Sequence, residues 1–276
     1  TRFTDVTGVQ TCALPIYGVK AKFFPAWTRA SVRLADALIA PSQATVDEVR
    51  RVTGAPANKF SVIPHGVDLE RFHPPTGAEI EAAREWAGLA ASVPYVAFLG
   101  TIEPRKNVPA LIRAWTQVCR EVADPPALVL AGGRGWDDEV DPAIAAVPHN
   151  LTVRRPGFVP EHLAAGLLGG AEVVAYPSLG EGFGLPVLEG MACGTPVLTT
   201  SLLSLPEVGG DAVRYAASPT PDDLADALRD LLGDPAERSR LAAAGLARAQ
   251  GFSWQHTVDE HVSLIEGLAS TQEAMP

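Results

Sequence analysis

Short apolar segments alternate with longer amphipathic ones along most of the chain. Three segments are almost uninterrupted runs of apolar residues, at positions 95–99, 127–131 and 171–176, and residues 195–200, TPVLTT, read as a further strand. Strands of a parallel sheet have this composition because helices cover both of their faces. Between the first two runs, apolar residues recur at helical spacing over residues 108–120. The pattern predicts an α/β fold, a Rossmann-like parallel sheet with helices on both faces.

A glycine-rich segment follows the third apolar run, where residues 176–195 read YPSLGEGFGLPVLEGMACGT. Its loop glycines give the backbone freedom and let a ligand approach the main chain. Pro186 suits the first turn of the helix that follows. In a parallel sheet such a loop lies at the carboxyl end of the strands, with unpaired N–H groups of the helix directed at an anion. The glycines are Gly180, Gly182 and Gly184.

Two carboxylates and two cations are the candidate functional side chains. Glu181 and Glu189 flank the glycine loop, although Glu189 alone is equally well explained as a favourable partner of the helix dipole. Arg105 and Lys106 precede the helix at residues 108–120, where the dipole disfavours a cation by about 0.3–1 kcal/mol. The pair indicates a diphosphate clamp, and a solvated loop is the alternative. Asn107 is the expected N-cap of this helix.

Composition narrows the classes of function. The 276 residues carry a net charge of −10 and no basic patch, which argues against a nucleic-acid partner. No apolar run approaches the roughly 18–20 residues of a membrane-spanning helix. The N-terminus shows no secretory signal. Cys12, Cys119 and Cys193 have neither metal-binding nor redox spacing. We therefore expect a cytoplasmic protein with reduced thiols.

The glycine-rich segment resembles the signature of a known family. The segment contains Glu-Gly-Phe-Gly-Leu-Pro, a second glutamate eight residues after the first, and then Met-Ala-Cys-Gly-Thr-Pro-Val. This pattern is similar to that of the retaining "group 1" glycosyltransferases of the GT-B fold, which use nucleotide-sugar donors. Residues 103–107, EPRKN, also match. Residues 63–68, IPHGVD, resemble the family's segment that crosses between domains, although asparagine is common at the position of His65. The resemblance covers residues 27–268 and implies the C-terminal half of a GT-B fold.

The resemblance implies roles for the matching residues. The two cations correspond to ligands of the donor diphosphate, where they stabilise the departing group. Many members carry arginine directly after the glycine at position 100, where this chain has Thr101, which leaves more of that work to Arg105. One carboxylate, Glu189, accepts hydrogen bonds from ribose hydroxyls and the other, Glu181, from a sugar hydroxyl. The expected catalytic residues are Glu181, Arg105 and Lys106; the expected donor-binding residues are Gly100, Arg105, Lys106, Phe158, Val159, Gly182, Phe183, Gly184, Leu185 and Glu189.

The implied activity is transfer of a mannose-like hexose, with retention of configuration, from a nucleotide-diphosphate sugar to a saccharide or lipid-linked acceptor. GDP-mannose is the favoured donor. The sequence has no Asp-X-Asp triplet, so neither a metal nor another cofactor is expected. The two carboxylates would also suit a glycosidase, but both lie on one loop and helix and not on opposing walls. The remaining alternative is a catalytically incomplete fragment that binds the nucleotide sugar.

The expected organisation has four parts. Residues 1–16 look foreign, because residues 6–16 resemble a translated sequencing adapter; an irregular native segment is the alternative. Residues 17–66 would be a remnant of the N-terminal acceptor-side domain with the crossing segment. Residues 67–252 would form the nucleotide-sugar-binding domain, and residues 253–276 the last helix and tail. The missing N-terminal domain would hold the acceptor and allow peripheral association with the inner membrane face.

Overall fold

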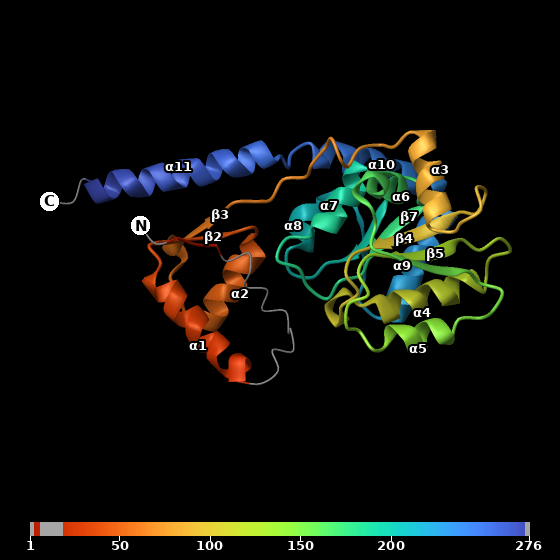
Figure 1. Ribbon diagram of the computed structural model, residues 1–276, viewed down its shortest axis with the longest axis horizontal. Helices are drawn as coiled ribbons and strands as arrows, with labels where there is room; N and C mark the ends of the chain where they lie inside the picture. Colours follow the sequence, from red (N-terminus) through yellow and green to blue (C-terminus); the bar gives the residue numbers. More distant parts are fainter. Residues whose placement is uncertain (1–2, 6–18, 274–276) are drawn as a thin grey trace. The chain divides into compact units, whose positions relative to one another are not determined.

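The computed structural model describes residues 3–5 and 19–273, which form two compact units (Figure 1). The first unit comprises Thr1–Gly66, Glu181–Phe183 and Phe252–Pro276. The second comprises Val67–Gly180 and Gly184–Gly251. The glycine loop is therefore divided between the two units. Its central tripeptide, Glu181–Phe183, belongs to the first unit, and the residues on either side belong to the second. The adapter-like residues 6–16 lie outside the described residues.

A six-stranded, all-parallel sheet forms the centre of the second unit. The spatial order is β6-β5-β4-β7-β8-β9. The central strands are buried along nearly their whole length, as the apolar runs predict, because helices cover both faces. The strands are β4 (Tyr95–Leu99), β5 (Ala127–Ala131), β6 (Val153–Gly157), β7 (Val173–Tyr176), β8 (Val197–Thr200) and β9 (Arg214–Ala216). The expected Rossmann-like α/β fold is confirmed.

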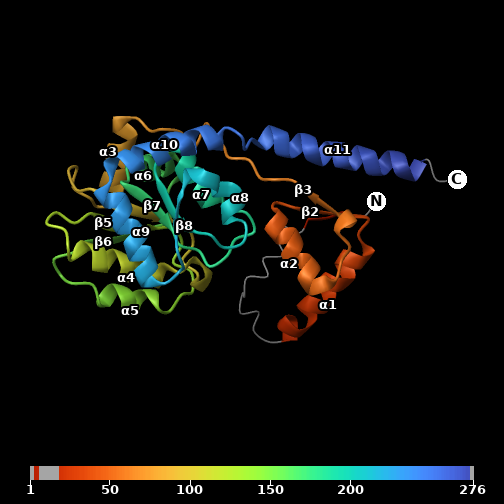
Figure 2. The ribbon, with the colours of Figure 1, turned by 180° about the vertical axis from the view of Figure 1, so that it is seen from behind.

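Helices pack in two layers against this sheet (Figures 1 and 2). In one group α4 packs against α5 and α9; in the other α3 packs against α6, and α7 against α10. Short 3₁₀ turns, among them Pro104–Lys106, join several elements. The helices are α3 (Gly77–Trp86), α4 (Val108–Cys119), α5 (Val140–Ala145), α6 (Ala164–Gly169), α7 (Leu185–Ala192), α8 (Leu205–Gly209), α9 (Pro221–Gly233) and α10 (Pro235–Ala249).

The first unit contains a smaller parallel sheet, in the order β1-β2-β3. Its elements are β1 (Phe3–Asp5), α1 (Val19–Leu34), β2 (Ala37–Ala40), α2 (Gln43–Thr53), β3 (Phe60–Val62) and α11 (Trp254–Glu273). Ser42 caps the start of α2 by accepting from the N–H of Thr45, and Gly54 ends the helix with a left-handed φ of 73°. The sequence predicts both boundaries, because serine suits an N-cap and glycine suits the position that follows the last turn of a helix.

The crossing segment and the start of α11 lie close together within the first unit. A Cβ atom on Gly66 would lie 2.1 Å from the backbone nitrogen of Trp254, so only glycine fits at position 66. The Thr257 hydroxyl donates to the carbonyl of Pro64 at 2.7 Å. Further along α11, the apolar side chains of Val258 and Val262 remain exposed.

Two local expectations hold only in part. Asn107 occupies the N-cap position of α4, as expected, but its side chain does not cap the helix; its backbone is left-handed, with a φ of 56°, and its amide donates to the carbonyl of Pro219 instead. The sequence also predicts a short strand at residues 151–153, LTV, whereas β6 begins at Val153 and takes in Pro156 and Gly157. Proline is tolerated there because β6 is an edge strand.

Candidate functional site

The glycine loop joins the carboxyl end of β7 to the N-terminus of α7. Gly184 occupies the N-cap position with a φ of 116°, a conformation that favours glycine, and Pro186 lies in the first turn. The first N–H groups of an α-helix have no partner within the helix. The structure therefore has the strand, loop and helix arrangement that the sequence predicts for an anion-binding element, at the edge of the sheet where such sites lie.

Arg105 lies beside the first half of this loop. Its guanidinium donates to the carbonyl of Gly180 at 3.0 Å and forms an ion pair with Glu103 at 3.4 Å. Its own carbonyl accepts from the N–H of Leu179 at 2.8 Å and from the hydroxyl of Ser178 at 3.2 Å. The loops after β4 and β7 are thus joined through one arginine, so the predicted cation does lie at the start of the glycine loop.

Lys106 is buried and not solvated, with 7% of its surface exposed. Its ammonium donates to the hydroxyl of Tyr176, the last residue of β7, and lies 4.6 Å from the centroid of the same ring. The ring of Tyr176 in turn stacks on Phe98 from β4. The ammonium group of Lys106 therefore lies at the carboxyl end of the sheet, against the last residue of β7. Sequence reasoning did not identify Tyr176 as a partner of the lysine.

Glu189 lies in the second turn of α7, within the electrostatic reach of two cations. Burial raises the pKa of Glu189 to about 7, while the charges of Arg71 and Lys106 act in the opposite direction. Lys106 and Glu189, 83 positions apart in the sequence, therefore belong to one neighbourhood. Arg71 belongs to it as well, and no motif in the sequence marked it as a functional residue.

Gly182 and Phe183, in the central tripeptide of the loop, have partners in the first unit. The carbonyl of Gly182 accepts from the hydroxyls of Ser42 at 2.7 Å and Thr45 at 2.9 Å. The ring of Phe183 packs edge-on against His65 and Phe252. Glu181 is buried, with 6% of its surface exposed. The sequence indicated Ser42 only as a helix cap, and it gave no sign that Thr45 contacts the loop.

The remaining predicted residues follow neighbouring strands of the large sheet. Gly100 directly follows β4, and its backbone lies close to the loop after β5. A Cβ atom on Gly132, in that loop, would lie 2.1 Å from the carbonyl oxygen of Gly100. Phe158 and Val159 come just after the edge strand β6, where Phe158 is 80% exposed and Val159 is buried. Three strand spacings, about 14 Å, separate β6 from β7. The predicted donor residues of the second unit thus share one edge of the sheet without forming one tight cluster.

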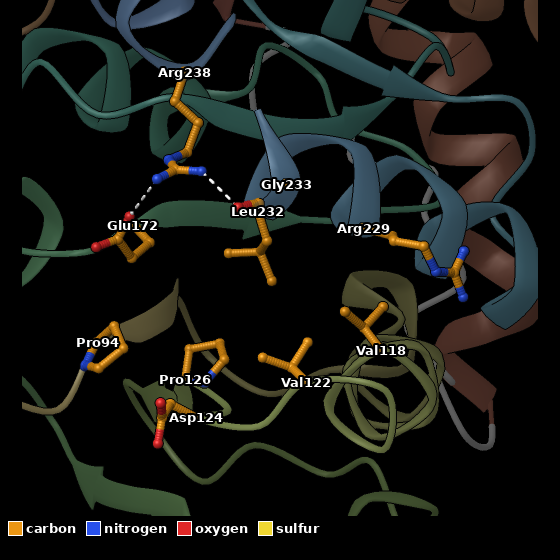
Figure 3. A pocket seen from close by; sticks show the side chains of 10 residues that line it. All are labelled: Pro94, Val118, Val122, Asp124, Pro126, Glu172, Arg229, Leu232, Gly233 and Arg238. Carbon is orange, nitrogen blue, oxygen red and sulfur yellow. Dashed lines mark hydrogen bonds and ion pairs between the residues drawn. The ribbon is translucent and has the colours of Figure 1, made fainter. Parts of the chain in front are cut away.

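A separate cavity of about 420 Å³ lies at the other end of the same sheet. Its lining includes Pro94, Pro126 and Glu172, which precede β4, β5 and β7. Figure 3 shows Arg238 reaching from α10 to Glu172 and to the backbone of Leu232. No predicted site residue lines it, and ligands of open α/β sheets bind at the carboxyl ends of the strands. The cavity's position therefore separates it from the candidate site.

Metal and thiol chemistry find little support in the described part of the chain. Within residues 3–5 and 19–273 there is no group of three or more histidine, cysteine, aspartate or glutamate side chains that could hold a metal ion. Burial raises the pKa values of Cys119 and Cys193 to about 12, so neither is a thiolate at neutral pH. In the same residues, no helix combines the length and the apolar character needed to cross a bilayer.

Solved structures with the same fold define the class of protein. Sucrose-phosphate synthase from Thermosynechococcus elongatus superposes with a TM-score of 0.78 at 23% identity, over 98% of this chain and 68% of that one. Anabaena HepE in complex with UDP-glucose superposes with a TM-score of 0.74 at 22% identity, over 91% and 69% of the two chains. At these identities the likeness shows the fold alone. That fold, together with the glycine loop on its sheet edge, is the GT-B glycosyltransferase fold.

Sequence comparison then places the chain within that class. The profile described as "Glycosyl transferases group 1" matches residues 79–248, more than half of the chain, and "Glycosyltransferase Family 4" matches residues 12–71. The chain belongs to the group 1 glycosyltransferases.

Among its curated relatives, the chain is 36% identical over 175 residues to O-antigen chain mannosyltransferase B of Escherichia coli, covering 63% of this chain and 46% of that protein. It is 34% identical over 242 residues to the D-inositol 3-phosphate glycosyltransferase of Nocardia farcinica, covering 82% and 51%. The chain spans about half the length of the curated relatives it matches.

Proposed function

We propose that the protein transfers a mannose-like hexose from a nucleotide-diphosphate sugar to a saccharide or lipid-linked acceptor, with retention of configuration and without a metal ion. The observation that carries the proposal is the position of Arg105 and Lys106 at the edge of the sheet where the glycine loop leaves β7, with Glu189 within the electrostatic reach of Lys106. The mannosyltransferase among the relatives supports the sugar, and the UDP-glucose bound to HepE supports the donor class.

In the proposed reaction, the bond between the anomeric carbon and the diphosphate oxygen breaks while the acceptor oxygen bonds to that carbon. The leaving diphosphate keeps the electron pair, so negative charge grows on its oxygens. Arg105 and Lys106 stabilise that charge, because preorganised cations in a partly dry site act strongly on developing charge. The acceptor hydroxyl passes its proton to an oxygen of the leaving diphosphate as the new bond forms.

The carboxylates hold the donor in this scheme. Glu189 accepts hydrogen bonds from two ribose hydroxyls, for which its two oxygens are suited. Glu181 accepts from a hydroxyl of the sugar. The backbone around Phe158 and Val159, after β6, meets the base. The separation of about 14 Å between β6 and β7 is of the size that an extended nucleotide spans, which fits a donor lying along the edge of the sheet.

Calorimetric titration of the chain with GDP, UDP and GDP-mannose tests the donor site. We expect one nucleotide diphosphate to bind, and the Arg105→Ala, Lys106→Ala double variant to bind it at least about 100-fold more weakly, because two charge-assisted contacts are lost. A matched control replaces Arg113 and Arg120, exposed on α4, with alanine and removes the same charge. Equal affinities for the two double variants would contradict the assignment.

The alternative is a chain that binds the donor without transferring the sugar, and it follows from the coverage of about half of each relative's length. Incubation with GDP-mannose distinguishes a transferase from a protein that only binds the donor. A transferase releases GDP, and proton NMR of the first sugar product shows the anomer of the donor if configuration is retained. Tight binding with no GDP release over many hours would favour the binding protein.

A further inference from the structure

Two hydroxyl groups from α2 hold one carbonyl of the glycine loop. The hydroxyl of Ser42 donates to the carbonyl oxygen of Gly182 at 2.7 Å, across 140 positions of sequence. The hydroxyl of Thr45 donates to the same oxygen at 2.9 Å. Ser42 is almost completely buried, with 1% of its surface exposed. Because a carbonyl oxygen has two lone pairs, these two bonds satisfy its full capacity.

Ser42 has two functions at this position. Its oxygen accepts from the N–H of Thr45 at 3.1 Å and so caps α2. Its single proton lies within reach of the Gly182 carbonyl at 2.7 Å and of the Thr45 hydroxyl at 3.0 Å, and the carbonyl is the nearer acceptor. A hydroxyl can do both, since it has one proton and two lone pairs. Alanine at position 42 would remove both interactions. At position 45, valine would remove only the hydroxyl and would leave the backbone N–H bonded to Ser42.

The held carbonyl fixes more than one atom. A peptide group is planar, so the direction of the Gly182 carbonyl also sets the direction of the N–H of Phe183. Glycine has no side chain of its own to restrict its backbone, and a Cβ on Gly182 would make only an ordinary contact, 3.6 Å from the Thr45 hydroxyl. The two hydroxyls and the packing of Phe183 therefore restrict the backbone of this tripeptide.

We infer that Ser42 and Thr45 are positioning residues for the donor site: they hold the Gly182 carbonyl so that the Glu181–Phe183 tripeptide is ordered before the donor binds. The inference rests on the proposed function, because the tripeptide carries Glu181, Gly182 and Phe183 of the proposed donor site. A preordered loop loses less conformational freedom on binding, which raises affinity without any contact between α2 and the ligand.

Hydrogen exchange of the ligand-free chain gives a test that does not depend on the donor. We expect the amides of residues 181–184 in Thr45→Val to exchange roughly 2- to 10-fold faster than in the unsubstituted chain, the range that corresponds to one net hydrogen bond. Thr45→Ser keeps the hydroxyl and should restore slow exchange. The matched control is Thr53→Val, which removes a hydroxyl of α2 that bonds the carbonyl of Val49.

Titration with GDP and UDP supplies the second readout. Thr45→Val should raise the dissociation constant of the bound nucleotide by roughly 2- to 10-fold. Both Thr45→Ser and Thr53→Val should bind the nucleotide as tightly as the unsubstituted chain. Equal exchange in Thr45→Val and Thr53→Val would overturn the inference. If the unsubstituted chain bound neither nucleotide, the proposed function would fail, while the exchange rates would still decide whether the hydroxyls order the loop.

Discussion

The two halves of the glycine loop are held by different kinds of partner. Residues 177–180 bond to Arg105, through both its guanidinium and its backbone carbonyl. The tripeptide Glu181–Phe183 bonds to the neutral hydroxyls of Ser42 and Thr45 and packs against aromatic rings. A charge therefore anchors the first half, and neutral hydroxyls hold the Gly182 carbonyl in the second, which we call the neutral half after these hydroxyls.

The two kinds of partner have different roles towards the proposed donor. Arg105 is at once an anchor of the loop and a proposed ligand of the diphosphate, so donor binding and loop geometry are coupled through one side chain. A guanidinium has five donors, which allows both roles together. Ser42 and Thr45 have no charge to offer the donor. The hydrogen bonds that they make to the Gly182 carbonyl should persist when pH or salt changes, while the ion pair of Arg105 with Glu103 should weaken as salt rises.

The largest expected effect lies on the charged side, at Glu189. Burial raises its pKa from an ordinary 4.5 to about 7. Below about pH 4.5 the group is protonated in both the folded and the unfolded chain, and its burial carries no charge penalty. As the pH rises through 7, the folded protein must ionise a buried carboxyl, so stability falls by on the order of 2–3 kcal/mol. Glu189→Gln should not show this loss.

Urea unfolding at pH 5 and pH 8 gives the free energy of unfolding of Glu189→Gln and of the unsubstituted chain, and the effect is the difference between the two proteins at each pH. Glu189→Gln should gain stability relative to the unsubstituted chain as the pH rises. The exposed Glu70→Gln provides a control for the loss of one negative charge. Nucleotide affinity should move in the opposite direction, because glutamine offers a single oxygen to the ribose. The same pH slope in Glu189→Gln and the unsubstituted chain would contradict the burial of this carboxyl.

A smaller effect compares Gly182, in the neutral half, with Gly184, at the N-cap of α7 just after it. Gly184 has a φ of 116°, and a Cβ there would lie 3.0 Å from the side chain of Leu205. Gly184→Ala should therefore lower the free energy of unfolding by about 1–2 kcal/mol. Gly182→Ala should change it by less than about 0.5 kcal/mol, because the added methyl group meets only ordinary contact. Urea unfolding of the two variants decides, and equal losses would show that the loop tolerates a side chain no better at Gly182 than at Gly184.

The sequence predicted the larger sheet well because its strands are buried on both faces. Runs such as residues 95–99 and 127–131 can be recognised without any knowledge of their neighbours, and both became strands. The cations at 105 and 106 were also predicted from local information, because a charge pair before a helix N-terminus is unfavourable without an anion. Local patterns thus identified the charged half of the loop.

The neutral half was missed for a physical reason. A hydrogen bond from Ser42 to Gly182 leaves no periodicity in the sequence, and a serine before a helix is already explained as a cap. The partnership of Lys106 with Tyr176 is equally invisible, since an apolar run shows only that the tyrosine is buried. Asn107 shows the converse error: the residue type suited a cap, but its left-handed backbone directed the side chain to Pro219.

The smallest expected effect tests the aromatic part of the neutral half. The ring of His65 meets Phe183 edge-on, with centroids 5.2 Å apart, and lies 5.6 Å from the ring of Trp254. His65→Asn, the residue expected from the family, removes the ring and should cost about 0.5–1 kcal/mol of unfolding free energy. His65→Phe keeps a ring and should lose less in the same urea titration. If the phenylalanine variant were the less stable of the two, the polar atoms of His65 and not its ring contacts would hold this part of the loop.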